Sequence, residues 1–252
     1  MIAPTRRKLF RAARNIPNLL HGFNLRVNRD KLRLIDLAFR EVIPRAKSFA
    51  DLGGVWRVNA AYTRYTLRRF PITRGVLVDT DFPAGLLPML GRFGNLEMIP
   101  DGFGKESVVG RVGTVDVVYL FDVLLHQANP DWDEILRRYA ANTRCFVIYN
   151  QQFVGGARTE RLTDRPMEEY IALTSDHAED LIRRIYLHGD ETHPAQGKPW
   201  KDIHNVIQWG ITDDGLRDTM ARLGYTEVFY RNYGMFLDLP AFEEHAFIFL
   251  KK

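Results

Sequence analysis

The sequence has little that could crosslink the chain or carry it through a membrane. Only one of its 252 residues is a cysteine, so no internal disulfide can form. That residue, Cys145, lies in an apolar run, which indicates a small buried side chain in a reducing, cytoplasmic setting. No run of about 18 or more apolar residues occurs, so we expect no membrane span. The charged start of the chain also lacks the continuous apolar stretch of a signal peptide.

A strong excess of charge is missing too. The chain has 35 Lys and Arg against 31 Asp and Glu, a formal net charge of +4. Much of the excess lies in an arm at Arg6, Arg7, Lys8, Arg11 and Arg14. A solvated helix start explains this arm more simply than contact with an acidic surface. We therefore expect no nucleic-acid partner. The 46% of hydrophobic residues suffices for one large domain with a real core.

The glycine pattern of a dinucleotide site is absent as well. An apolar run at 48–52 is followed by Gly53 and Gly54, and a helical pattern starts near Asn59. Glycine lets the backbone approach a ligand, and a helix N-terminus offers free N–H groups. A dinucleotide needs Gly-x-Gly-x-x-Gly, whereas here Val55 and Trp56 follow the glycines, and the indole would crowd a pyrophosphate. The turn therefore argues against a nicotinamide-dependent oxidoreductase.

Apolar strands alternate with helices over the first 150 residues. The patterns predict strands at 48–52, 75–79, 96–99, 115–120 and 144–149, and helices at 31–42, 59–69, 83–91 and 131–139. No helix is predicted between the third and fourth strands. Near-continuous apolar strands of this kind indicate a parallel sheet with helices on both faces.

The alternation stops after residue 150 and resumes near residue 212. We divide the chain into a basic, helical segment at 1–44 and a main domain at 45–252, with a polar insertion at 154–208 that forms a substrate lid. The insertion should hold helices at 166–173 and 177–186. A helix at 212–223, capped by Thr212 and ended by Gly224, precedes strands at 226–233 and 245–250. A loop containing Pro240 should separate these last two strands.

Polar side chains occur where the predicted strands end. They are Asp51, Asp79, Asp101, Asp122 and Asn150. Ligands of open α/β sheets bind beyond the carboxyl ends of the strands, and an acid after the second strand, here Asp79, suits the two hydroxyls of a ribose. Each acid alone is better explained as a cap or turn residue. Together, on one edge of one sheet, they favour a binding site.

With these motifs, the sequence resembles the class I S-adenosylmethionine-dependent methyltransferases, over roughly 45–150 and 209–252. The first motif is carried by 49–54, the adenine-side turn by 101–103, the fourth motif by 116–126 and the late helix and turn by 212–225. The resemblance implies a Rossmann-like, doubly wound and mostly parallel seven-stranded sheet, with an antiparallel C-terminal strand and helices on both faces. It also implies S-adenosylmethionine as the cofactor.

The resemblance assigns ten residues to the cofactor site: Asp51, Gly53, Gly54, Asn59, Asp79, Asp101, Gly102, Phe103, Phe121 and Asp122. The later glycines of the first motif are replaced by Val55 and Arg57. Asn59 or the backbone of the two glycines is then left to hold the methionine end.

The activity expected is O-methylation of a small hydroxylated molecule such as a glycoside, a polyketide or another metabolite. His126 follows the fourth strand, and an imidazole, with an ordinary pKa of about 6.5, suits a general base. A structural histidine at the strand-to-helix turn explains it equally. Asp122 and Asn150 are the oxygen ligands that an Mg²⁺ ion would use, as in some members of the family. N- or C-methylation, a nicotinamide-dependent oxidoreductase, a cofactor-binding protein without catalysis and a homodimer all stay open.

Overall fold

The computed structural model describes residue 16, residues 23–174 and residues 179–252. The basic arm at 6–14 and the predicted helix start at residue 177 lie outside the described residues. No helix among the described residues is long and apolar enough to cross a membrane.

The described chain forms a seven-stranded sheet in the order β3-β2-β1-β4-β5-β9-β8. The strands are β1 (Ser48–Leu52), β2 (Arg74–Asp79), β3 (Leu96–Pro100), β4 (Val115–Phe121), β5 (Thr143–Phe153), β8 (Tyr225–Phe236) and β9 (Leu239–Lys251). β9 runs antiparallel to both of its neighbours, while β1 to β5 pair in parallel. This arrangement confirms the predicted fold class.

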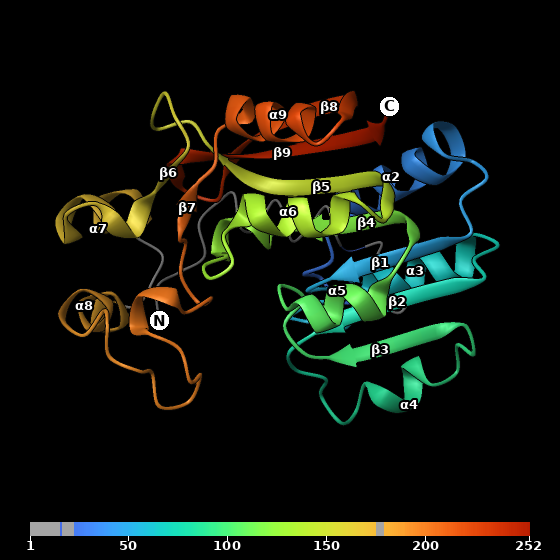
Figure 1. The fold of residues 1–252 in the computed structure, drawn as a ribbon, viewed down its shortest axis with the longest axis horizontal. Coiled ribbons are helices and arrows are strands. Elements are labelled where there is room, and N and C mark those ends of the chain that lie inside the picture. The colour runs from blue at the N-terminus through green and yellow to red at the C-terminus, as the bar shows by residue number, and fades with distance from the viewer. Residues whose placement is uncertain (1–15, 17–22, 175–178) are drawn as a thin grey trace.

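Helices cover both faces of the sheet (Figure 1). Behind it lie α2 (Arg29–Leu37), which continues into a π-helical turn at Ala38–Val42, and α3 (Ala61–Arg69). In front lie α5 (Glu106–Val112), α6 (Trp132–Ala140) and α9 (Asp213–Arg222), while α4 (Leu87–Leu90) lies beside β3. Each face has its own apolar core, because β1, β4 and β5 are almost wholly buried and contribute alternate side chains to the two layers.

The predicted insertion lies beyond the carboxyl ends of the parallel strands, at the left of Figure 1. It contains β6 (Glu160–Arg161), α7 (Met167–Thr174), α8 (Glu179–Leu187) and two short 3-10 turns at Leu162–Asp164 and Trp200–Asp202. β6 pairs with β7 (Trp209–Gly210) in a small separate sheet. Buried residues of the insertion, including Leu162 and Tyr170, form an apolar cluster with Phe153 and Phe242. The insertion is therefore packed onto the ends of β5 and β9.

Four local predictions were wrong. The helix α5 was missed, because Gly110 and its valines lower helix propensity, yet Val108 and Val112 bury one face of it. The helix expected at 83–91 shrinks to α4. β5 continues past Tyr149 because β9 pairs with it as far as Phe153, so Asn150 lies inside a strand rather than at its end. Pro240 lies near the start of β9, and the hairpin turn is formed by Leu237 and Asp238 instead.

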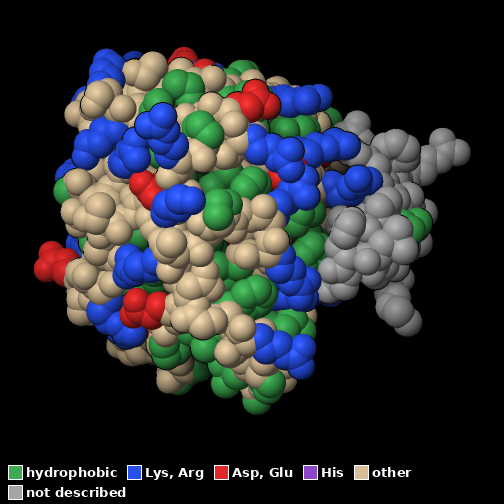
Figure 2. Space-filling model, turned by 90° about the vertical axis from the view of Figure 1, so that its right-hand side faces the viewer, with side chains coloured by type: hydrophobic (Ala, Val, Ile, Leu, Met, Phe, Trp, Pro, Cys, Tyr) green, Lys and Arg blue, Asp and Glu red, His purple; other side chains and the backbone are tan. Residues whose placement is uncertain are grey.

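Lys and Arg side chains cover much of the opposite edge of the sheet, at the right of Figure 1 (Figure 2). The parallel strands begin here, so Lys47, Arg74 and Arg144 lie at this edge. The helices that return from the other edge end here, and the last turns of α3, α5 and α9 carry arginines. Cations at helix C-termini are favoured by the helix dipole. The basic edge is therefore a consequence of the topology.

Candidate functional site

The turn after β1 lies tightly between two neighbouring strand ends. Gly53 has φ +78°, and its N–H donates to the carbonyl of Val78 at 2.7 Å. A Cβ at Gly53 would stand 2.7 Å from Val123 Cγ1 and 3.5 Å from the Phe103 ring. Only glycine fits this conformation and this space. The structure thus brings Gly53, Phe103 and Val123, the residue after Asp122, together.

Asp51 supports this turn from below. Its side chain is buried, and Thr63 Oγ1 donates to Oδ2 at 2.6 Å. A Cβ on Gly54 would stand 2.4 Å from the Asp51 carboxyl carbon. Burial raises the pKa of Asp51 to about 7, and the charge of Asp79 adds to the rise, while the Thr63 hydrogen bond opposes it. The structure therefore places Asp51 beneath the turn, as a support for Gly54.

Asp79, the predicted ribose acid, ends β2 beside the same turn. Its Oδ2 accepts from the backbone N–H of Val55 at 2.8 Å. Burial raises the pKa of Asp79, although hydrogen bonds from backbone N–H groups, beginning with Val55, oppose the rise. One carboxylate oxygen therefore holds the loop.

The loop that replaces the missing glycines keeps a glycine-like backbone. Arg57, Asn59 and Ala60 have φ values of +61°, +53° and +55°. Such conformations cost on the order of 1 kcal/mol each for residues other than glycine, and they persist where surrounding contacts impose them. Asn24 Nδ2 donates to the Arg57 carbonyl at 3.0 Å, so the segment before α2 holds this loop. Asn59 is exposed at the start of α3.

In the adenine-side turn, Asp101 lies at the surface and Phe103 in the core. Asp101 is half-exposed, and Lys105 and the Gly102 N–H contact its Oδ1 at 2.7 Å each. The hydrogen bond from Lys105 contributes most to lowering its pKa. Phe103 is buried, and its carbonyl accepts from the Tyr139 hydroxyl at 2.7 Å. The turn is thus fixed to α6 and presents Gly102, whose Cβ position is open, towards solvent.

The end of β4 carries a partly buried ion pair that the sequence did not reveal. Phe121 packs its ring against Tyr62 and Tyr119 on the α2 and α3 face of the sheet. Asp122 has φ +58°, and its carboxylate contacts Lys31 Nζ of α2. Because a lysine already neutralises Asp122 and Asn150 lies buried inside β5, these two residues do not form the predicted Mg²⁺ site. Among the described residues, no group of three or more His, Cys, Asp and Glu could hold a metal ion.

His126 ends a short 3-10 helix, η3 (Leu124–His126), that is bonded to the insertion. Its Nδ1 lies 2.7 Å from the Val206 carbonyl, and a carbonyl only accepts, so Nδ1 carries a proton. His204 Nδ1 in turn donates to the His126 carbonyl at 3.0 Å, and the Gln208 N–H donates to the Leu125 carbonyl at 2.8 Å. In the neutral imidazole of His126, Nε2 is therefore the basic nitrogen.

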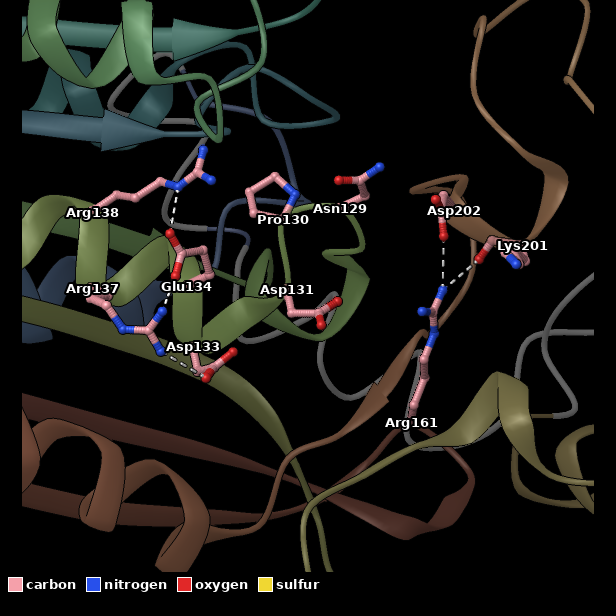
Figure 3. A pocket seen from close by; sticks show the side chains of 10 residues that line it. All are labelled: Asn129, Pro130, Asp131, Asp133, Glu134, Arg137, Arg138, Arg161, Lys201 and Asp202. Carbon is pink, nitrogen blue, oxygen red and sulfur yellow. Dashed lines mark hydrogen bonds and ion pairs between the residues drawn. The ribbon is translucent and has the colours of Figure 1, made fainter. Parts of the chain in front are cut away.

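A charged hollow lies between α6 and the insertion (Figure 3). It is lined by Asn129, Pro130, Asp131, Asp133, Glu134, Arg137, Arg138, Arg161, Lys201 and Asp202. Arg161 donates to the buried Asp202 at 3.0 Å and faces Asp131 across the hollow. Burial raises the pKa of Asp131, and the charge of Arg161 opposes this rise. Pro130 packs against Gly104, so the hollow borders the adenine-side turn.

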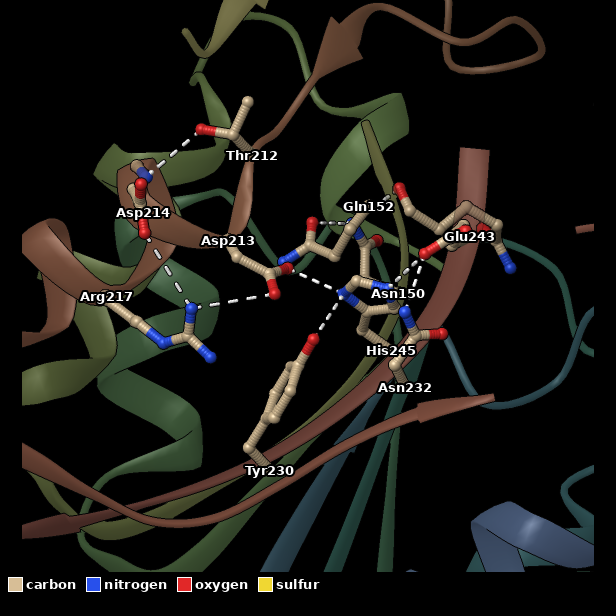
Figure 4. Close-up of polar contacts among 12 residues, drawn as sticks. Asn150, Gln152, Thr212, Asp213, Asp214, Arg217, Tyr230, Asn232, Glu243 and His245 are labelled. Carbon is tan, nitrogen blue, oxygen red and sulfur yellow. Dashed lines mark hydrogen bonds and ion pairs between the residues drawn. The ribbon is translucent and has the colours of Figure 1, made fainter. Parts of the chain in front are cut away.

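A second polar cluster, the His245 cluster, links β9 to the start of α9 (Figure 4). The buried imidazole of His245 has Nδ1 2.7 Å from Asp213 Oδ1 and Nε2 3.2 Å from Glu243 Oε2. Each ring nitrogen thus lies beside one carboxylate oxygen. Asn232 Nδ2 donates to Glu243 at 2.6 Å. This cluster joins three elements and is a structural crosslink.

The strand order, the closing antiparallel strand and the glycine turn at the carboxyl edge can now be compared with known proteins. No protein-family model and no curated protein sequence matches the chain. Solved structures do match. One is the 1,6-didemethyltoxoflavin-N1-methyltransferase of Burkholderia thailandensis, with a TM-score of 0.54 and 14% identity, over 100% of this chain and 92% of the other. The chain has the class I S-adenosylmethionine-dependent methyltransferase fold.

Two further structures share the class I methyltransferase fold. The N-terminal domain of EvdMO1, solved in the presence of S-adenosylhomocysteine and D-fucose, matches with a TM-score of 0.53 and 14% identity, over 88% of this chain and 82% of the other. An O-methyltransferase family protein from Burkholderia thailandensis matches with a TM-score of 0.52 and 14% identity, over 88% and 56%. At this level of identity the likeness concerns the fold.

The described residues fit an S-adenosylmethionine molecule better than a dinucleotide. The turn can lie this close to Val123 and Asp51 only because Gly53 and Gly54 have no Cβ. Asp79 ends the neighbouring strand, and the turn that carries Phe103 closes the other side. The exposed Trp56, stacked under Arg57 at 4.0 Å, lies where a pyrophosphate would need glycine backbone.

Sequence reasoning missed Lys31 and His245. Lys31 lies near the start of the predicted helix at 31–42, and a lysine near the apolar side of a helical pattern is the only local signal it offers. His245 was seen only as the first residue of the last strand. Their partners, Asp122 and Asp213, are 91 and 32 residues away along the chain. Neither pairing follows a motif spacing.

Proposed function

We propose that the protein is an S-adenosylmethionine-dependent methyltransferase that methylates a hydroxyl group of a small molecule. The observation that carries the proposal is the meeting of Gly53, Asp79 and Phe103 at the carboxyl edge of a sheet with this strand order. O-methylation is the finer part of the proposal. It is supported by His126 beyond β4, because a hydroxyl acceptor must lose a proton and the ring has a basic Nε2.

The residues of this chain divide the work as follows. The Gly53–Gly54 backbone and Asn59 would hold the methionine end, Asp79 Oδ1 the ribose hydroxyls, and Gly102 and Phe103 the adenine. Once bound, S-adenosylmethionine supplies an activated methyl group. His126 takes the proton of the acceptor at Nε2, and the Val206 carbonyl holds the ring in the tautomer that allows this.

The insertion shapes the acceptor pocket. It packs on the ends of β5 and β9 and is bonded to η3, next to His126. The hollow between α6 and the insertion carries both charges, which suits a polar acceptor better than a wholly apolar one. A small molecule is favoured over a macromolecule because the insertion lies beyond this edge and packs on the end of β5 and the start of β9.

Thermal-shift measurements with S-adenosylhomocysteine and with NAD test the cofactor class. We expect stabilisation by S-adenosylhomocysteine alone, because a ligand that binds only the folded state raises the melting temperature. Stabilisation by NAD alone would show that the protein is an oxidoreductase-type binder and would end the proposal.

The role of His126 is tested by His126→Ala in an assay that follows S-adenosylhomocysteine release with a panel of hydroxylated small molecules. We expect turnover to disappear while S-adenosylhomocysteine still binds. The matched control is His188→Ala, which removes an exposed histidine of the insertion whose ring lies 2.9 Å from the nearby Glu191. Full activity of His126→Ala would remove His126 as the base and leave the cofactor assignment intact.

A further inference from the structure

Lys31 is a buried cation at the carboxyl edge of the sheet. Its side chain is 5% exposed, against 35% for Asp122. The ammonium contacts Asp122 Oδ2 and lies 4.9 Å from the centre of the Tyr149 ring and 5.7 Å from the centre of Phe121. A buried ammonium is costly unless it is paired, and aromatic faces add to the compensation. One carboxylate and two aromatic rings therefore stabilise a buried positive charge at this position.

The carboxylate of this pair is held in one orientation. Gln151 Nε2 donates to Asp122 Oδ1 at 2.8 Å, so each oxygen has a fixed partner. Asp122 also occupies the left-handed region of backbone space, a strained conformation that gathers at functional sites. The following residue, Val123, contacts the Gly53 position. The pair is thus one residue from the turn on which the cofactor would lie.

As a whole, the pair carries no net charge, and this matters for the proposed reaction. In methyl transfer to a hydroxyl, a C–O bond forms as the C–S bond breaks, sulfur keeps the electron pair and loses its positive charge, and the hydroxyl proton passes to a base. A lone carboxylate beside the sulfonium would stabilise the charged reactant more than the transition state, in which that charge is dispersed. Interactions of that kind tighten binding and slow the reaction.

We propose that Lys31 neutralises Asp122 so that this carboxylate does not hold the charged cofactor too tightly. Lys31 is a positioning residue that sets the preference between S-adenosylmethionine, which carries a sulfonium, and S-adenosylhomocysteine, which carries a neutral thioether. This inference rests on the proposed function, because it needs the cofactor to bind at the Gly53–Gly54 turn.

The test compares the dissociation constants of the two molecules, measured by titration calorimetry on the full chain. Lys31→Met keeps most of the length of the side chain but leaves Asp122 as a lone anion, so the preference should shift towards S-adenosylmethionine by about threefold to tenfold. Asp122→Asn leaves Lys31 as a lone cation and should shift the preference the other way. The double variant Lys31→Met/Asp122→Asn is neutral again and should return near the wild-type ratio.

Two controls separate charge from structure. Arg33→Met removes an exposed cation from the same helix, paired with Asp30, and should leave the ratio unchanged. Lys31→Arg keeps the charge and should stay near the wild type. Melting temperatures report whether each variant folds.

The outcomes are distinguishable. An equal loss of affinity for both molecules in Lys31→Met, or a ratio that does not move in opposite directions for the two single variants, overturns the inference while the proposed function stands. A wild-type protein that binds neither molecule overturns the proposed function and this inference with it.

Discussion

The pKa of an aspartate is raised at one edge of the sheet and lowered at the other. Asp51 and Asp116 lie on the paired strands β1 and β4, the first near the carboxyl edge and the second near the amino edge. Burial raises the pKa of Asp51 to about 7. Burial acts on Asp116 too, but there hydrogen bonds from Lys47 and Ser48 outweigh it and lower the pKa.

The two pKa values shift in opposite directions because the hydrogen-bond donors around the two carboxylates differ. Asp116 Oδ2 accepts from the backbone N–H groups of Lys47 and Ser48 at 2.8 and 3.0 Å and from the Ser48 hydroxyl at 2.9 Å. The Asp51 carboxylate accepts from Thr63, while the charge of a second carboxylate, Asp79, raises its pKa further. At the amino edge these donors stabilise the ionised form of Asp116. Asp51 has the donors of one residue, Thr63, and is almost completely buried, so the cost of burial outweighs them.

The largest expected contrast comes from Asp51→Asn. The folded pKa of Asp51 lies above its ordinary value of 3.8, so its contribution is fully present below about pH 3.8 and is lost as the pH rises through about 7. The wild type should therefore lose stability relative to Asp51→Asn between pH 4 and 8, by about 4 kcal/mol at most. Urea unfolding of both proteins across this range measures it. A pH-independent difference would contradict the buried acid, and the exposed Asp218→Asn serves as the control.

Gly53→Ala should come next. The added methyl group would force a left-handed residue against Val123, and we expect a loss of about 2 to 4 kcal/mol in unfolding free energy. The matched control is Gly94→Ala, whose Cβ position has no heavy atom within 4 Å. If the two variants unfold at the same urea concentration, the carboxyl-edge turn is not as tightly packed as described.

Asp116→Asn should change stability with pH in the opposite direction to Asp51→Asn. Because the folded pKa is lowered, the stabilisation by Asp116 is present above its ordinary value of 3.8 and is lost as the pH falls through the folded pKa. The variant should be less stable by about 1 to 2 kcal/mol near pH 7, with the gap closing in acid. Chemical unfolding at pH 7 and pH 3 follows the gap, and one that widened in acid would refute the assignment.

Arg144→Met should have the smallest effect. Arg144 is largely exposed and lies 3.3 Å from Asp116. Exposed ion pairs contribute little, so we expect less than about 0.5 kcal/mol in the same unfolding assay. A loss as large as that of Asp116→Asn would mean that the arginine, rather than the backbone donors, holds the carboxylate.

Much of the fold followed from the sequence because the strands are short apolar runs with clear ends. β1 was predicted at its observed bounds, and the Thr212 cap of α9 accepts from the Gly215 N–H as expected. The elements that were missed depend on tertiary contacts. α5 is stabilised by burying two valines, and the polar end of β5 stays in the sheet because β9 pairs with it.

The candidate site was predictable where a motif is local and unpredictable where it is not. Gly53, Asp79 and Phe103 come together because each follows a strand of one parallel sheet. Lys31 reaches Asp122 from a helix that no motif connects to β4. The sequence also did not predict the left-handed residues in the loop at Arg57–Ala60, because none of them is a glycine, the residue that usually adopts this conformation.

The bonds between η3 and the insertion have a consequence for how this protein can change. The Val206 carbonyl orients the His126 ring, while the His204 ring and the Gln208 N–H hold the backbone of η3. Remodelling this stretch to admit a different acceptor would also turn the imidazole. The helices α7 and α8 share this constraint, because the Tyr170 hydroxyl of α7 donates to the Ile207 carbonyl at 3.0 Å and Ile185 of α8 clusters with Val206.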